Sequence, residues 1–211
     1  INFTYSGTND LAVGKKPMAL ALGNFNADGN IDVVTANFDD DTATVVLGNG
    51  TGGAISTSTQ PVSDGPRAVA VGFLDDADTY LDFVTANDRA GAGDDISVVR
   101  GNGNGTFQTA AQYPLLNNGN TTSAGPRAIV VGEFSEDTIA DIAVTDFDAN
   151  KISVFKGLTN NTYSLSTPSA YGGSLSQPYG LVAAEFSTQR EDITYLGNPN
   201  HAADRGPNAG Y

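Results

Sequence analysis

The segment Asn24–Asp32, which reads NFNADGNID, places side-chain oxygens at alternating positions of a short loop. Asparagine or aspartate occupies loop positions 1, 3, 5 and 9, a backbone carbonyl is available at position 7, and Gly29 stands at position 6. Ca²⁺ binds several oxygens at once, and a loop that wraps around it needs a sharp turn where glycine is well tolerated. The spacing therefore predicts a calcium site. Its predicted ligands are Asn24, Asn26, Asp28, Asn30 and Asp32.

The Asn24–Asp32 loop differs from an EF-hand in one respect that bears on affinity. Position 12 would be Thr35 rather than a bidentate glutamate, and strand-like rather than helix-like sequence flanks the loop. Only two of its side chains are carboxylates, so we expect a dissociation constant of roughly 10⁻⁴–10⁻³ M, as in extracellular calcium modules. The alternative is a metal-free turn, because Asn, Asp and Gly favour tight turns without any ion.

Three later segments carry degenerate versions of this loop. One keeps the spacing but has Thr138 in place of the glycine, and it predicts a possible second site at Glu133, Ser135, Asp137 and Asp141. Another has an extra residue and Phe73 at the first ligand position, and it predicts a weak site at Asp75, Asp76, Asp78 and Asp82. The last, at Glu185, Ser187, Gln189 and Asp192, is one residue short and predicts a turn without an ion.

The composition argues against catalysis, nucleic-acid binding and membrane insertion. The chain has no cysteine and a single histidine, His201, and no activated nucleophile can be named beside it. With 24 acidic and 10 basic residues, the net charge of −14 repels nucleic acid and anionic membranes. No apolar run approaches the roughly 18 residues of a spanning helix. We therefore predict a protein that is not an enzyme.

An internal repeat organises the chain around these loops. Four similar segments contain Pro17, Pro66, Pro126 and Pro178, so successive repeats are 49, 60 and 52 residues apart. This period suits one four-stranded sheet per repeat, as in a β-propeller blade. The repeats span about 14–64, 65–124, 125–176 and 177–211 of a single domain, 1–211, and residues 1–13 are predicted to form the outer strand of a preceding or closing blade.

Each repeat is predicted to contain four strands. Apolar runs between Gly-Pro and the acidic loop, such as Arg67–Leu74 and Arg127–Phe134, predict inner strands. Second strands are expected at Asp32–Phe38, Asp82–Asn87 and Asp141–Phe147, and third strands at Thr42–Leu47, Ile96–Arg100 and Ile152–Lys156. More polar fourth strands are expected at Ala54–Val62, Thr106–Leu116 and Thr162–Tyr171. The fold class is thus all-β, with antiparallel blades that form a closed four-bladed ring or part of a larger propeller.

At these residues the sequence resembles the FG-GAP/VCBS repeats of the integrin-alpha-type β-propeller. The motif runs through Pro17–Val34 and Thr42–Gly50, and Gly103–Phe107 (GNGTF) is another family-like turn. The resemblance implies a propeller that is usually seven-bladed and extracellular, calcium bound in the turn between the first two strands, and a role in adhesion or ligand binding.

The leading functional expectation is a non-catalytic, calcium-stabilised adhesion or structural module at the cell exterior, secreted or cell-surface. Its partner would be a protein or glycan, and self-association could complete the ring. One alternative is a carbohydrate-binding propeller, with Tyr113, Tyr171 and Tyr179 as candidate stacking residues. Another is an accessory domain of a larger secreted enzyme. Arg67 and Arg127, in equivalent Gly-Pro-Arg positions, are expected to have a structural role rather than to bind a ligand, either by hydrogen-bonding turn carbonyls or by pairing with acidic residues.

Overall fold

The computed structural model describes residues 10–75, 78–88, 94–115, 125–135, 137–166, 176–187 and 190–196. These residues form strands and turns, and no helix among them is long and apolar enough to cross a membrane. The secondary structure confirms the all-β prediction.

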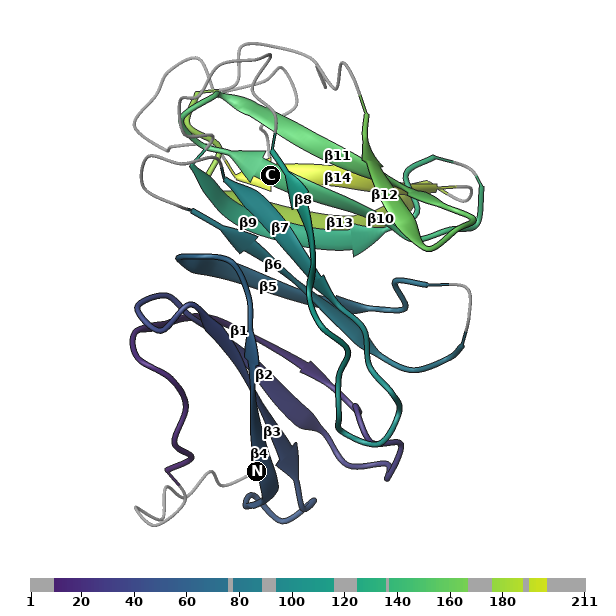
Figure 1. Ribbon diagram of the computed structural model, residues 1–211. Coiled ribbons are helices and arrows are strands. Elements are labelled where there is room, and N and C mark those ends of the chain that lie inside the picture. Colours follow the sequence, from purple (N-terminus) through teal and green to yellow (C-terminus); the bar gives the residue numbers. More distant parts are fainter. Residues whose placement is uncertain are drawn as a thin grey trace.

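Three four-stranded antiparallel sheets and one two-stranded sheet follow one another along the chain (Figure 1). In each complete sheet the strands are hydrogen-bonded in sequence order, which is the blade architecture that the repeat predicts. Blade 1 comprises β1 (Pro17–Gly23), β2 (Asp32–Asn37), β3 (Thr42–Gly48) and β4 (Ala54–Pro61). Blade 2 comprises β5 (Pro66–Gly72), β6 (Asp82–Asn87), β7 (Asp95–Val99) and β8 (Ala111–Pro114). Blade 3 comprises β9 (Pro126–Gly132), β10 (Asp141–Asp146), β11 (Lys151–Leu158) and β12 (Thr162–Leu165), and the fourth sheet comprises β13 (Gly180–Ser187) and β14 (Arg190–Leu196).

Burial within a blade explains the residue types of its strands. The middle strands are rich in Val, Ile, Ala and Thr and are almost wholly buried. In blades 2 and 3, neighbouring blades cover both of their faces. The outer strand β4 is polar and mostly exposed, as expected for a sheet edge that meets solvent.

The hydrophobic core lies between the blades. The inner strands β1, β5, β9 and β13 lie side by side, so alternate residues of each sheet pack against the sheets before and after it (Figure 1). Three separate clusters result, one at each junction: Phe25, Val34, Val45 and Phe83 with others between blades 1 and 2, Val84, Ile96, Ile142 and Phe155 with others between blades 2 and 3, and Phe134, Ile152 and Leu181 with others between blade 3 and β13.

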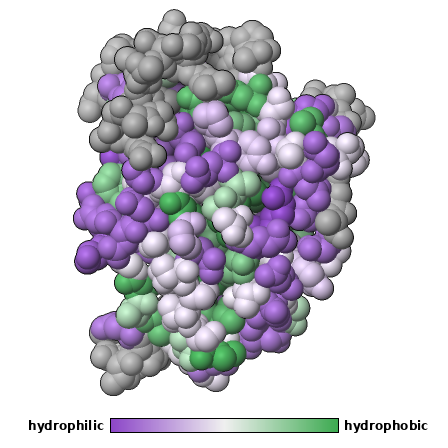
Figure 2. Space-filling view, viewed as in Figure 1, coloured by the Kyte–Doolittle hydropathy of each residue, from purple (hydrophilic) through white to green (hydrophobic). Residues whose placement is uncertain are grey.

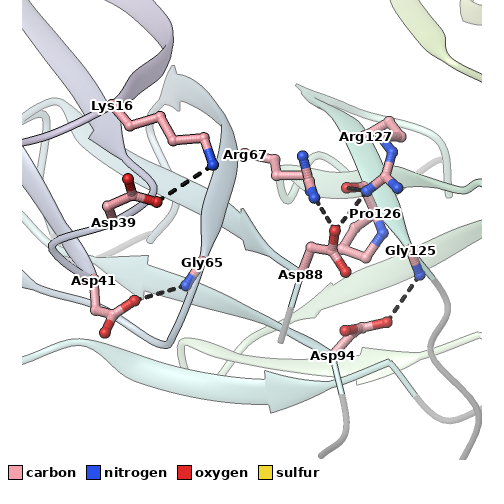
Figure 3. Close-up of polar contacts among 10 residues, drawn as sticks. All are labelled: Lys16, Asp39, Asp41, Gly65, Arg67, Asp88, Asp94, Gly125, Pro126 and Arg127. Carbon is pink, nitrogen blue, oxygen red and sulfur yellow. Dashed lines mark hydrogen bonds and ion pairs between the residues drawn. The ribbon is translucent and has the colours of Figure 1, made fainter. Parts of the chain in front are cut away.

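Charged side chains tie the blades together at the start of the inner strands (Figure 3). Asp88 of blade 2 accepts hydrogen bonds from Arg67 Nε of its own blade and from Arg127 Nη1 of blade 3, the latter at 2.7 Å. The guanidinium groups also lie over aromatic rings, Arg67 over Phe38 and Arg127 over Phe147. Pairing with acidic residues, one of the two structural roles predicted for both arginines, is confirmed.

The array is open within the described residues, which do not form the closed four-bladed ring that was one of the two predicted arrangements. The other arrangement, part of a larger propeller, stays a prediction. Blade 1 and the β13–β14 sheet lie at opposite ends of the stack (Figure 1), so no contact between them closes a circle. Residues 10–13 form no strand, and the rest of the predicted N-terminal strand lies outside the described residues.

The predicted outer strand Thr106–Leu116 is also wrong at its N-terminal end, since β8 begins only at Ala111. Phe107 instead packs against Phe25 and Phe83, with ring centroids 5.6 and 5.3 Å away. The segment before β8 is therefore drawn into the junction between blades 1 and 2. In blade 3, the predicted outer strand beyond residue 166 lies outside the described residues.

Candidate metal centre

The last acidic residue of each loop is a structural anchor. Asp32 is fully buried, and its two carboxylate oxygens accept hydrogen bonds from the backbone N–H groups of Phe25 (2.7 Å) and Gly48 (2.8 Å). The same bonds recur in the other two blades, where Asp82 accepts from Leu74 and Gly101 and Asp141 accepts from Phe134 and Gly157. Each aspartate thus ties the loop to the end of the third strand. A carboxylate oxygen keeps a further lone pair after accepting one N–H, so this role leaves room for a metal ion.

The tip of the first loop brings three of the predicted ligands together. Asn26 Nδ2 donates to Asp28 Oδ2 at 3.0 Å, and the Asn30 backbone N–H donates to Asp28 Oδ1 at 2.8 Å. The Asn30 N–H group lowers the pKa of Asp28 below its ordinary value, so this exposed carboxylate is ionised at neutral pH. Ala27 and Gly29 have positive φ angles of 58° and 85°, which fold the loop back on itself.

The remaining predicted ligand of this loop, Asn24, carries an unsatisfied oxygen. Its Oδ1 atom is buried and has no hydrogen-bond partner. An unpaired buried oxygen is costly, and coordination to a cation is one way to satisfy it. Oxygens of Asn24, Asp28 and Asp32 in one nine-residue loop fit a hard cation such as Ca²⁺.

The second acidic loop is paired with a basic side chain. Arg100, which follows β7, forms an ion pair with Asp75 at 3.2 Å, and both side chains are largely buried. Asp78 Oδ1 accepts the Tyr80 backbone N–H at 2.8 Å. Burial raises the pKa of Asp82 to about 6 in spite of its two backbone donors. Asp76 lies outside the described residues.

The third acidic loop is also paired with a basic side chain. Lys156 Nζ lies 3.0 Å from Asp137 Oδ2, and Glu133 Oε1 accepts the backbone N–H of Ser135 at 2.8 Å. Ser135 Oγ lies 3.4 Å from Asp141 Oδ1, so the four predicted ligands are in one cluster. Thr138 has a φ of 71°, matching the conformation of Gly29 in the first loop. The turn is kept without glycine, at the expense of strain in a β-branched residue.

A single position on the third strand distinguishes the three loops. Val46, Val99 and Phe155 are the cross-strand partners of equivalent second-strand residues, so the residues that follow them, Leu47, Arg100 and Lys156, are also equivalent. Blades 2 and 3 therefore supply a side-chain cation to their acidic loops, whereas blade 1 has a leucine there. In the described part of the chain, no Lys or Arg pairs with Asp28 or Asp32.

Sequence reasoning missed the basic side chains of Arg100 and Lys156, because it compared the acidic loops with one another and not with the third strands that lie beside them. The signal was present in the basic residues at the positions equivalent to Leu47. Among the described residues there is no group of three or more His, Cys, Asp or Glu side chains that could hold a metal. A site at Asn24–Asp32 would instead combine two carboxylates with neutral oxygens. The side chains of the fourth loop, and His201, lie outside the described residues.

The candidate sugar-stacking tyrosines have different surroundings. Tyr113 is half-buried and forms a T-shaped contact with Tyr163, with ring centroids 5.6 Å apart. Tyr179 is 63% exposed and makes an edge contact with Phe147. Tyr171 lies outside the described residues. Carbohydrate binding stays a prediction, and Tyr179 is the most exposed of its candidate residues among those described.

Comparisons with known proteins bear on the fold. No family model matches the sequence, and no curated protein matches it. A solved structure, described as the crystal structure of BBS1N in complex with ARL6DN, soaked with lead, is similar with a TM-score of 0.57 and 15% sequence identity. The match covers 91% of this chain and 53% of the BBS1N chain, so the present chain spans about half of that length. Together with the three four-stranded sheets, the likeness shows a β-propeller-like fold.

Proposed function

We propose that this chain is a non-catalytic, calcium-stabilised β-propeller segment that serves as an adhesion or structural module at the cell exterior. The observation that carries the proposal is the contrast between the loops. Arg100 and Lys156 compensate the acidic loops of blades 2 and 3, whereas among the described residues no basic side chain pairs with the acids of the Asn24–Asp32 loop. Calcium would take the corresponding place in blade 1.

The ligands of the proposed site are Asn24, Asn26, Asp28 and Asp32 by side-chain oxygens and Asn30 by its carbonyl. Asp28 and Asn26 already lie together at the tip of the loop, and Asn24 Oδ1 has no other partner. Bound calcium would hold the tip against the buried Asp32 anchor and so stiffen the connection between β1 and β2. Since ions that bind only the folded state stabilise it, unfolding should depend on calcium concentration.

The proposed location follows from the expected affinity. Two carboxylates and several neutral oxygens suit a dissociation constant of roughly 10⁻⁴–10⁻³ M, which is the range of extracellular calcium modules. The net charge of −14 also suits an environment that contains divalent cations. The BBS1N structure contains a bound protein, ARL6DN, which supports the proposal that this fold can present a protein-binding surface.

Thermal unfolding tests the calcium proposal. Wild type, Asp28→Ala and Asp39→Ala would be compared in about 10 mM CaCl₂ and in excess chelator. Asp39 is a matched control because it is a surface acid of the same blade, half-exposed and paired with Lys16. At 10 to 100 times the dissociation constant, binding stabilises the fold by about 1.4–2.7 kcal/mol. We expect a rise of several degrees for wild type and Asp39→Ala, and loss of most of it in Asp28→Ala. An equal response of all three proteins would refute the site.

A further inference from the structure

One side of blade 1 presents apolar residues to solvent. The side of blade 1 that points away from blade 2, which we call the leading face, carries the exposed Leu20, Leu22 and Ile31, the half-buried Val33 and the buried Val46. Leu20 is 63% exposed, Leu22 57% and Ile31 61%. Hydrophobic residues are visible at the end of the molecule where blade 1 lies (Figure 2). A shallow groove of about 530 Å³ on this side is lined in part by Leu11, Ile31, Val33 and Val46.

The same positions in blades 2 and 3 are buried at junctions between blades. The pairing registers make Leu20 equivalent to Val69 and Ile129, Val33 equivalent to Phe83 and Ile142, and Val46 equivalent to Val99 and Phe155. All six equivalents are less than 9% exposed and belong to the clusters that join each blade to the one before it. The leading face of blade 1 thus has the composition of a blade junction, but no blade packs on it among the described residues.

A polar contact that accompanies each junction points to the same conclusion. The backbone N–H of the residue before each later inner-strand proline donates to a side chain at the start of the preceding blade's third strand. The pairs are Gly65 to Asp41 at 2.9 Å, Gly125 to Asp94 at 2.8 Å and Gln177 to Asn150 at 2.8 Å (Figure 3 shows the first two). Lys16 holds this position in blade 1, with a φ of 53° like its counterparts. No side chain in the described ranges accepts its N–H.

The complementary surface is exposed at the other end of the stack. Leu181 and Ala183 of β13 pack against blade 3, whereas Val182, which alternates to the opposite side, is 48% exposed. Its equivalents Ala21, Ala70 and Val130 each pack toward the following blade. We call the Val182 side of β13 the trailing face. One chain therefore carries, at the two ends of its stack, faces of the two kinds that meet at each of its three internal junctions.

We infer that the leading face of blade 1 binds the trailing face of β13 in a second copy of this chain. Such a contact is head-to-tail, so it continues the blade stack from one chain into the next and forms a closed ring if the rotation closes or a filament if it does not. Pairing two leading faces would bring together two surfaces that lack the small residues and polar acceptors of a trailing face. The inference does not depend on calcium binding, and its test can fail independently of the proposed function.

Sedimentation velocity on the full 211-residue chain tests the inference. Leu20→Glu places a charge in the leading face and Val182→Glu places one in the trailing face, so each should prevent that face from binding. Both positions are exposed, so folding should be retained. Phe73→Glu is the matched control, since Phe73 is 56% exposed but lies in the second acidic loop. We expect wild type and Phe73→Glu to reach at least twice the mass of one chain as concentration rises, and each face variant alone to stay at the mass of one chain. Circular dichroism would check folding, and Leu22→Glu serves if Leu20→Glu unfolds.

Mixing the two face variants distinguishes the modes of association. Leu20→Glu keeps an intact trailing face and Val182→Glu keeps an intact leading face, so an equimolar mixture should form a dimer with one intact junction. Three results would overturn the inference: a wild type that remains a single chain at its highest soluble concentration, face variants that associate as well as wild type, or a mixture that does not dimerise. Association of Val182→Glu on its own would indicate pairing of two leading faces.

Discussion

Replacing Asp146 with asparagine should stabilise the protein at neutral pH. Asp146 ends β10, where the equivalent residues of β2 and β6 are Asn37 and Asn87. Asn37 is fully satisfied, because Thr35 donates to its Oδ1 and its Nδ2 donates to Thr44 at 2.8 Å. Asp146 is equally buried but accepts only from Ser153 Oγ at 2.5 Å, and its Oδ1 atom has no partner. Lys151 Nζ, at 3.6 Å, offsets its charge in part.

The size of the effect follows from the pKa of Asp146. Burial raises this pKa from 3.8 to about 6, against the lowering influence of Ser153 and Lys151. A carboxyl group with a raised pKa binds its proton more tightly in the folded state, so stability falls as pH rises from about 4 to 6 and the loss is complete above pH 6. A shift of about two units corresponds to about 3 kcal/mol. Asp146→Asn removes this cost and restores the amide found in the other blades.

Urea unfolding of both proteins at several pH values between 4 and 8 measures this difference. We expect Asp146→Asn to be more stable by up to about 3 kcal/mol at pH 7–8, with the difference shrinking toward zero near pH 4. Asn37→Asp, which introduces a carboxylate at the equivalent site, should show the opposite pH dependence. A stability difference that does not change with pH, or a less stable Asp146→Asn at pH 8, would refute the reasoning.

Two further predictions concern the third loop. Thr138→Gly relieves a β-branched residue with a φ of 71° and should raise the free energy of unfolding by about 1 kcal/mol, measured by urea denaturation; unchanged or lower stability would contradict the strain argument. Lys156→Met removes the ion pair of Asp137, so in an Asp28→Ala background it should restore a calcium-dependent rise in melting temperature. A melting temperature that does not change with calcium would show that Lys156 does not occupy the place of a metal ion.

The repeat made most of the fold predictable. Because Pro17, Pro66, Pro126 and Pro178 recur before similar apolar runs, the inner and second strands could be placed within a few residues of their observed bounds. The start of the outer strand of blade 2 could not be placed, because Phe107 packs against Phe25 and Phe83 between blades 1 and 2 instead of joining that strand. That packing depends on where the neighbouring blade lies, which local sequence does not encode.

The sequence indicated which loop to consider as a metal site but not the electrostatics of that loop. The spacing of Asn24–Asp32 pointed to one loop with side-chain oxygens, in which Asn26 and Asp28 are in contact. The spacing did not show that Asp32 anchors the turn through two backbone N–H groups. Nor did it show that Arg100 and Lys156 reach the other loops from a neighbouring strand, since cross-strand register decides that contact.

The most direct test of the account is isothermal titration of calcium into the wild-type chain, Asp28→Ala and Asp137→Ala. The account predicts about one ion per wild-type chain, with a dissociation constant of roughly 10⁻⁴–10⁻³ M. Asp137→Ala should bind equally well, because Lys156 already occupies the third loop, whereas Asp28→Ala should show no binding. Absence of binding to wild type, or binding that Asp137→Ala abolishes and Asp28→Ala retains, would contradict the assignment of the metal centre to Asn24–Asp32.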